Sequence, residues 1–239
     1  MVKTILIIQA RMGSSRLPGK ILLPLGTSDN LAYVTERCKR IVDEVIVATS
    51  TLPQDDLVAA WCKQRNIACY RGSEEDVLDR FVQAAKPYNP DYVIRVTADC
   101  PFVDIEMGID MLNMMKERQV DIIDITGQLP RGLAVEVVSY QALLYIHKYG
   151  LEQRYREHVT YYAYEYRSEF TRASYQVPSN RLYPELRITL DTSEDYAVIA
   201  NVAKHFNDLY IPSSEVIQYL LDHPDIAKKN ANIEQKPVV

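Results

Sequence analysis

The sequence has few of the features that mark secreted, zinc-binding or membrane proteins. Its cysteines, Cys38, Cys62, Cys69 and Cys100, have no CxxC spacing, which argues against a zinc site and, in a chain of 239 residues, against a disulfide framework. No apolar run approaches the ~20 residues of a membrane span, and the stretch Ile5–Ile8 is too short for a signal-peptide core. We therefore expect reduced thiols, a cytoplasmic location and no membrane insertion.

Positive charge is also scarce overall but is concentrated near the start. The chain has 27 basic and 32 acidic residues, a net charge of −5, which argues against nucleic-acid binding. No acid appears before Asp29, whereas Arg11, Arg16 and Lys20 follow one another within ten residues. This distribution is compatible with a small anionic ligand that is held by a local basic loop.

The first half predicts strands that alternate with helices. Strands are expected at Thr4–Gln9, Glu44–Thr49, Ile67–Tyr70, Tyr92–Val96 and Val120–Ile125. Helices are expected at Asn30–Ile41, over 55–66, at Ser73–Ala85 with Ser73 as N-cap, and after the cap Asp104. This alternation is typical of βαβ units and a mostly parallel sheet.

The second half departs from this rhythm. Leu133–Val138 alternates like an antiparallel strand, and further strands are expected at Phe170–Val177 and Leu186–Leu190. Helices are expected at Tyr140–Tyr149, Gln153–Tyr166, Glu194–Phe206 and Ser214–Asp222. Because there is no linker and no repeat, we predict one α/β domain over 1–239 with an α+β extension and a polar tail over 226–239.

The segment QARMGSSRLPGK, residues 9–20, directly follows the first predicted strand. Loops at the carboxyl ends of parallel strands are where open α/β sheets bind ligands, and arginine suits paired contacts with phosphate oxygens. The spacing is not that of a P-loop, because five residues separate Gly13 from Gly19 and Ile21 follows Lys20. The residues suggest a polyphosphate cradle; a solvated basic loop is the alternative.

This segment strongly resembles the signature of the cytidylyltransferase family typified by the spore-coat polysaccharide biosynthesis protein SpsF, with CMP-KDO and CMP-sialate synthetases as more distant relatives. The resemblance implies a nucleotide-diphospho-sugar transferase fold with a Rossmann-like, mixed and mostly parallel sheet. It also implies a nucleotide-binding half over about 1–125 and a sugar-binding and dimerisation half over about 126–225. The nucleotide-binding residues that it implies in this loop are Gln9, Ala10, Arg11, Gly13, Ser14, Arg16 and Lys20.

Two aspartates follow predicted strands far apart in the sequence. Asp99 lies in RVTADCPFVD and Asp191 in RITLDTSED. Either could be a cap or a turn residue, whereas together they could bind the Mg²⁺ that accompanies a triphosphate, if their loops converge. The family's DCP and DTPED segments resemble these motifs and imply that Asp99 and Asp191 are the metal ligands. Asp195 is better explained as the capping-box partner of Thr192.

Other motifs match the family in the expected order. YRGSEEDVLDRF implies Arg71 and Ser73 in the base pocket, although Ser73 could simply begin a helix. LPRGLAVEVVS implies that Glu136 faces the sugar, but Arg131 and Ala134 stand where acids are expected. EHVTYY implies a sugar contact for His158, which could also be structural, and Arg187 would serve an acidic sugar.

The leading hypothesis is therefore a CTP-dependent cytidylyltransferase that activates a sugar for surface or spore-coat polysaccharide synthesis. Its predicted catalytic residues are Arg16, Lys20 and Asp99, its cofactor is Mg²⁺, and its predicted state is a homodimer. A glycosyltransferase that uses a sugar nucleotide, and a nucleotide-binding protein without turnover, are the alternatives. The departure at Arg131 and Ala134 motivates the last of these.

Overall fold

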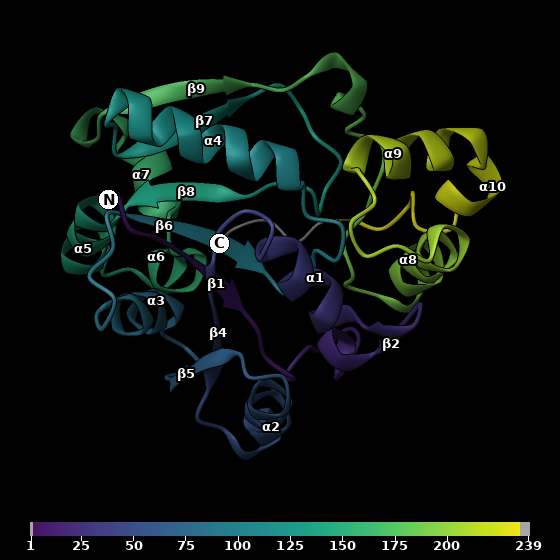
Figure 1. The fold of residues 1–239 in the computed structure, drawn as a ribbon, viewed down its shortest axis with the longest axis horizontal. Helices are drawn as coiled ribbons and strands as arrows, with labels where there is room; N and C mark the ends of the chain where they lie inside the picture. Colours follow the sequence, from purple (N-terminus) through teal and green to yellow (C-terminus); the bar gives the residue numbers. More distant parts are fainter. Residues whose placement is uncertain (1, 235–239) are drawn as a thin grey trace.

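A seven-stranded sheet forms the centre of the computed structural model, which describes residues 2–234 (Figure 1). The strand order is β5-β4-β1-β6-β8-β7-β9. Neighbouring strands are parallel except where β8 runs antiparallel to β6 and to β7. The expected mixed, mostly parallel sheet is therefore confirmed.

The strands are short. Those with the longest apolar runs are the most buried, whereas the edge strand at residues 68–72 has no fully buried residue. They are β1 (Thr4–Gln9), β4 (Glu44–Ser50), β5 (Ala68–Gly72), β6 (Tyr92–Thr97), β7 (Ile122–Thr126), β8 (Glu136–Ser139) and β9 (Arg172–Gln176). A separate two-stranded ribbon, which the sequence did not predict, pairs β2 (Pro24–Leu25) with β3 (Ser28–Asp29). Because β1, β4 and β6 run in parallel, the loops after them open at the same edge of the sheet.

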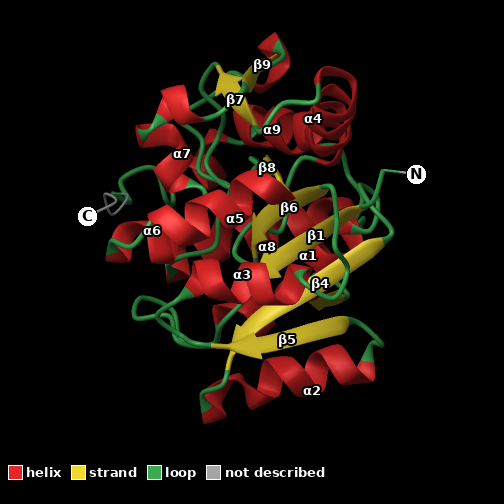
Figure 2. Cartoon of the chain, turned by 90° about the vertical axis from the view of Figure 1, so that its left-hand side faces the viewer, coloured by secondary structure: helices red, strands yellow, loops and turns green. Residues whose placement is uncertain are grey.

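Helices cover both faces of the sheet (Figures 1 and 2). One face carries α1 (Asn30–Cys38), α2 (Asp56–Gln64) and α4 (Ile105–Arg118), whereas the other carries α3 (Val77–Ala85), α5 (Tyr140–Tyr149), α6 (Gln153–His158) and α7 (Tyr161–Glu165). Alternate residues of β1 divide between the two cores. Leu6 and Ile8 pack with α1, α2 and α4, and Ile5 and Ile7 pack with α3 and α5; this follows from the two-residue period of a strand.

A third apolar cluster lies beside the sheet, where α8 (Ser193–Phe206), α9 (Ser213–Asp222) and α10 (Pro224–Ala227) pack together (Figure 1). Thr192 caps α8 and forms a capping box with Asp195, as predicted. Asp104 caps α4 by accepting from the Met107 amide at 3.0 Å. The polar tail was predicted over 226–239, and residues 235–239 lie outside the described part of the chain.

Three local predictions are wrong. Ser73 does not cap α3; Asp76 does, since its carboxylate accepts from the Asp79 amide at 2.8 Å. The helix expected at Gln153–Tyr166 is broken into α6 and α7 at Val159, whose φ is +45°. Leu186–Leu190 makes one isolated bridge and no ladder, because its amides bond in turn to two different loops: Ile188 donates to Arg131 O at 2.8 Å and Leu190 to Asp99 O at 2.8 Å.

Four single-turn 3₁₀ segments connect the described elements: η1 (Lys20–Leu22), η2 (Pro53–Asp55), η3 (Arg167–Glu169) and η4 (Ser179–Arg181). Within residues 2–234, no helix combines the length and the apolar character that crossing a bilayer requires. The element that bears most directly on function is η1, because it returns the basic loop after β1 towards the sheet.

Candidate active site

The basic loop after β1 folds back on itself. The amides of Ser14 and Gly19 both donate to Met12 O, at 2.9 and 3.1 Å. Gly19 has φ +71°, a left-handed conformation that glycine adopts readily, and it starts η1. This closed shape brings the Lys20 side chain towards the end of β6 and towards the residue that follows the segment 186–190.

Asp55, which sequence reasoning missed, ties this loop to the end of β4. The Asp55 carboxylate is fully buried and accepts from the Met12 amide at 2.7 Å and from the Ser50 amide at 3.2 Å, as well as from the Ser50 hydroxyl. It makes no helix-capping bond, although it stands just before α2. The sequence hid this role because an aspartate before a helix is ordinarily a cap, and its partner Met12 lies 43 residues away.

Lys20 joins the two aspartates that were predicted to bind metal. Its ammonium donates to Asp99 Oδ2 at 2.8 Å and to Asp191 Oδ1 at 2.7 Å. Arg16 pairs with the other oxygen of Asp191, at 3.0 Å. The loop cations and the two distant aspartates therefore meet at one point, which is the convergence that the sequence required.

The same contacts determine the charge states of this cluster. Burial opposes the charge of Lys20, but Asp99 and Asp191 outweigh it and raise the pKa of Lys20. Burial likewise opposes ionisation of Asp99, but the Lys20 ammonium and the hydrogen bonds from Lys20 and Thr97 lower the pKa of Asp99. The Lys20 ammonium and the Asp99 carboxylate therefore both remain charged at neutral pH.

Arg187 lies behind Asp191. Its guanidinium donates to Asp191 Oδ2 at 2.9 Å and to Asp195 Oδ1 at 2.8 Å. The side chain is buried, and the residue is not among those that line the cleft described next. The structure thus places Arg187 as a support for Asp191 and does not place it among the predicted substrate-binding residues.

A cleft in front of this cluster has two lobes that share a wall. The loop lobe, of about 590 Å³, is lined by the basic loop, including Gln9, Arg11, Gly13, Ser14, Arg16 and Lys20. The β8 lobe, of about 670 Å³, is lined by residues that include Arg95, Arg131, Gly132, Ala134 and Glu136. Six residues line both lobes: Gln9, Thr97, Asp99, Glu157, His158 and Asp191.

The β8 lobe contains Arg131 and Ala134, which stand where the resemblance led us to expect acids. Gly132 has φ +99°, and a Cβ there would lie 2.4 Å from Ile188 O, so the backbone of this segment is fixed against residues 186–188. Arg131 and Ala134 are both exposed in the lobe. The two residues therefore line the β8 lobe and do not line the loop lobe.

Glu136 and His158, both predicted to contact the sugar, line the β8 lobe together. Glu136 accepts from Arg95 at 2.6 Å and from the Thr160 hydroxyl. His158 ends α6 and is half-buried, and burial lowers the pKa of its imidazole. The lobe thus contains an ion pair and a neutral imidazole beside the shared wall.

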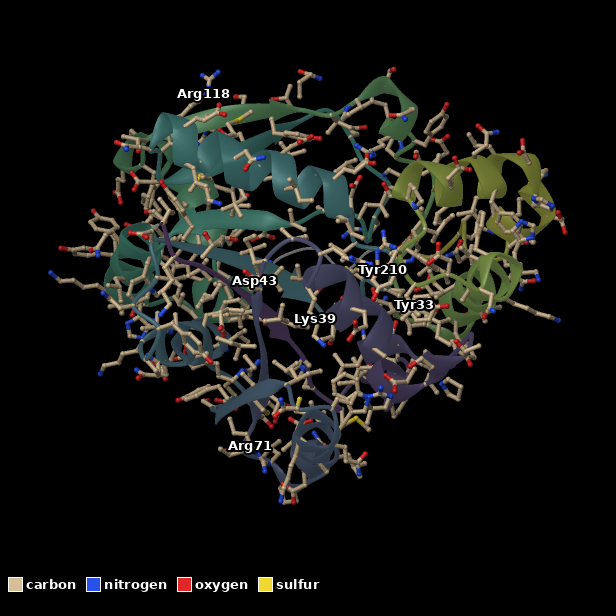
Figure 3. The ribbon with its side chains drawn as sticks, viewed as in Figure 1. Tyr33, Lys39, Asp43, Arg71, Arg118 and Tyr210 are labelled. Atoms are coloured by element: carbon tan, nitrogen blue, oxygen red, sulfur yellow. The ribbon has the colours of Figure 1, made fainter. Side chains whose placement is uncertain are left out.

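Three predicted nucleotide-binding residues do not line the cleft. Ala10 is buried, and its amide continues the sheet by donating to Ala48 O at 3.0 Å. Arg71 lies by β5 and α2 (Figure 3), where it donates to Ser50 O at 2.9 Å and pairs with Asp56 at 2.7 Å. Ser73 accepts from the Asp76 amide at 3.2 Å. The structure thus gives these residues local structural contacts.

The chemistry of Asp99 and Asp191 fits a magnesium ion. One oxygen of each carboxylate lies within 2.8 Å of the same atom, Lys20 Nζ, so the two groups already converge on a cation. Mg²⁺ prefers one or two carboxylates completed by phosphate oxygens and water. The described residues contain no cluster of three metal-ligating side chains, so a cation here would need oxygens from a ligand.

Comparisons with known proteins agree with this geometry. The family described as cytidylyltransferase matches residues 5–236. The spore coat polysaccharide biosynthesis protein SpsF of Bacillus subtilis is 36% identical over 92% of this chain and 95% of its own. The structure of a cytidylyltransferase from Leptospira borgpetersenii superposes with a TM-score of 0.89 at 29% identity, over 99% of this chain and 100% of that one. The 3-deoxy-manno-octulosonate cytidylyltransferase of Agrobacterium fabrum is 31% identical over 53% of this chain and 52% of its own.

Proposed function

Since the chain belongs to the cytidylyltransferase family and is a nucleotidyltransferase, we propose that it couples CTP to a sugar, giving a CMP-sugar and pyrophosphate. The observation that supports this most strongly is the meeting of Arg16, Lys20, Asp99 and Asp191 at the wall between two lobes. A triphosphate fits the basic loop lobe, and a sugar fits the β8 lobe. Both substrates would then reach the same wall.

In this mechanism the sugar hydroxyl attacks the α-phosphate and pyrophosphate leaves. Such transfers depend on positioning and on stabilising negative charge. Arg16 and the other loop cations bind the phosphates, while Asp55 and Gly19 keep the loop in its closed shape. Mg²⁺, held by Asp99 and Asp191, would neutralise charge that develops on the phosphate oxygens. Arg187 keeps Asp191 oriented towards the cleft.

Besides binding phosphate as one of the loop cations, Lys20 has a second role in this proposal. Two carboxylates that face each other repel, and the Lys20 ammonium keeps them close in the unliganded protein. The site is therefore assembled before the substrates bind, which lowers the cost of ordering it on binding. In the β8 lobe, Glu136 is held by Arg95 and Thr160, so it can accept hydrogen bonds from sugar hydroxyls in a fixed orientation.

The test is pyrophosphate release from CTP in the presence of Mg²⁺ and a panel of sugars that begins with 3-deoxy-manno-octulosonate. Release that requires the metal and one sugar supports the proposal, and ATP, GTP and UTP in parallel establish the nucleotide preference. Consumption of a sugar nucleotide without pyrophosphate would favour a glycosyltransferase instead. CTP binding in a calorimeter with no product from any sugar would favour a binding protein, the alternative that Arg131 and Ala134 motivate.

The same proposal includes a biological setting and an assembly. The product would supply surface or spore-coat polysaccharide synthesis in the cytoplasm, and the protein would act as a homodimer. An aromatic surface on α5–α7 suits such contact, because Tyr145, Tyr149 and Tyr166 are exposed. The rings of Tyr145 and Tyr149 contact each other at a tilt of 46°, with 4.4 Å between their centroids. Sedimentation of the wild type against Tyr149→Ser tests this: a dimer that the variant weakens supports it, and a wild-type monomer contradicts it.

A further inference from the structure

The shared wall of the two lobes is where a proton must be removed if the proposed reaction occurs, and the following inference rests on that proposed function. A sugar hydroxyl in the β8 lobe that attacks a phosphate in the loop lobe loses its proton at their boundary. The titratable residues that line both lobes are Asp99, Asp191, Glu157 and His158. The base that accepts the proton should be one of them.

The two aspartates are poor candidates because both are already engaged by positive charge. Asp99 accepts from Lys20 and from the Thr97 hydroxyl, at 2.8 and 2.6 Å. Asp191 accepts from Lys20 and Arg187 and pairs with Arg16. The oxygens of both carboxylates are therefore already occupied by donors, and in the proposed reaction the two groups would hold the metal.

Glu157 and His158 differ in their surroundings. Glu157 is exposed, whereas His158 is half-buried at the shared wall. General-base catalysis becomes more efficient as the pKa of the base approaches the working pH, and histidine is the side chain whose ordinary pKa lies nearest to neutral pH. The imidazole is therefore the candidate base, and Glu157 provides a comparison from the adjacent position.

The backbone around His158 is strained. His158 is the last residue of α6, and Val159 follows it with φ +45° and ψ −66°. A β-branched residue with positive φ is an outlier that costs on the order of 1–3 kcal/mol, and such strain gathers at functional sites. Val159 is fully buried, and the Thr160 hydroxyl next to it donates to Glu136. The break between α6 and α7 thus holds His158 at the cleft.

Charged and titratable groups face the imidazole from each neighbouring element. They are Glu157 of α6, Arg95 of β6, Glu136 of β8 and Tyr161 of α7, whose ring centroid lies 6.3 Å from that of His158. Arg95 and Glu136 pair with each other at 2.6 Å, so their effects on the ring oppose one another. Burial is the largest influence, and it lowers the pKa of His158. The ring is therefore neutral at pH 7, and a neutral imidazole has one ring nitrogen that can accept a proton.

We propose that His158 is the general base that removes the proton from the attacking sugar hydroxyl. The O–H bond breaks and its proton passes to a ring nitrogen, while the oxygen's electron pair forms the new bond to the α-phosphorus. The bond from that phosphorus to the bridging oxygen breaks, and pyrophosphate leaves with the electron pair. The imidazolium afterwards releases its proton to water.

The experiment uses the full chain with CTP, Mg²⁺ and the sugar that releases pyrophosphate in the panel above. His158→Gln should lower kcat by roughly 10²–10⁴-fold and change the calorimetric Kd for CTP by less than twofold. It should also remove the acid limb from the pH profile of kcat. Imidazole added to His158→Gly should restore turnover. Glu157→Gln should keep the acid limb of the pH profile of kcat, whatever its effect on the size of kcat.

Other results would overturn the assignment. If His158→Gln raises the KM for the sugar and leaves kcat unchanged, His158 only binds substrate. If imidazole gives no rescue, or Glu157→Gln removes the acid limb, another group is the base. Should His158→Gln fail to fold, His158→Asn and an NMR titration of the wild type replace it: an imidazole that is still charged at pH 7 contradicts the inference. A wild type that is inactive with every sugar refutes the proposed function itself, and this inference with it.

Discussion

Replacing Asp55 with alanine should remove the contact that anchors the basic loop while leaving the loop residues themselves unchanged. In the wild type the buried carboxylate accepts from the amides of Met12 and Ser50, at 2.7 and 3.2 Å. Alanine leaves both amides without this acceptor. Because a buried donor that loses its partner costs about 1–3 kcal/mol, we expect the free energy of unfolding to fall by roughly 3 kcal/mol.

The same substitution should weaken CTP binding even though Asp55 does not line the cleft. A hydrogen bond to a charged group contributes about 1.5–3 kcal/mol, and this one fixes the loop at Met12. Without this anchor, CTP binding must itself order the loop, and the binding free energy falls by that amount. The Kd for CTP then rises tenfold or more, since 1.4 kcal/mol is a factor of ten. Urea denaturation gives the first quantity and isothermal titration calorimetry the second.

Asp56→Ala is the matched control. Asp56 is the next residue, its side chain is 66% exposed, and it pairs with Arg71 at 2.7 Å. Exposed ion pairs contribute at most about 1 kcal/mol, so this variant should unfold and bind CTP almost as the wild type does. If Asp55→Ala and Asp56→Ala lose the same stability, or if Asp55→Ala binds CTP with unchanged affinity, the anchoring role is refuted.

Three further predictions concern the cluster and its surroundings. Arg16→Ala should weaken CTP binding by roughly 10–100-fold, since an arginine–phosphate contact contributes about 1.5–3 kcal/mol; an unchanged calorimetric Kd removes Arg16 from the phosphate site. Asp99→Asn should abolish Mg²⁺-dependent pyrophosphate release while circular dichroism stays the same, and retained turnover would dismiss it as a metal ligand. Hydrogen bonds from Arg172 and Arg167 lower the pKa of Asp124. The stability that the ionised Asp124 contributes is therefore fully present above the unfolded pKa of about 3.9 and is lost as pH falls through the lower pKa of the folded state. Urea midpoints of Asp124→Asn should therefore be lower than wild type at pH 6 and depend less on pH between 5 and 2; equal slopes would contradict this.

The parts of the fold that the sequence predicted well are those that depend on local pattern. The buried runs Ile5–Ile8 and Val45–Ala48 are apolar throughout because helices cover both faces of the sheet. Asp104 and Thr192 were recognised as caps because capping depends on neighbours three residues away. The meeting of Asp99 with Asp191 was expected from two strand ends, but only Asp99 follows a strand of the sheet; Asp191 is brought there by residues 186–190, where the Leu190 amide donates to Asp99 O at 2.8 Å.

The parts that could not be predicted depend on distant contacts. Nothing local distinguishes Asp55 from an ordinary cap, since its role requires Met12. Val159 adopts a backbone conformation that its own side chain disfavours, so propensity predicted a continuous helix there. Arg187 was expected to bind an acidic sugar. Its partners Asp191 and Asp195 follow it closely in the sequence, but the sequence does not reveal that all three side chains are buried together.

The central claim is that the basic loop and the two aspartates surround one CTP–metal complex. Anomalous diffraction from crystals grown with CTP and Mn²⁺ in place of Mg²⁺ tests it most directly. The account predicts a metal peak coordinated by both Asp99 and Asp191, with the triphosphate beside Arg16 in the loop lobe. A triphosphate bound elsewhere, or a metal that touches neither aspartate, would contradict it.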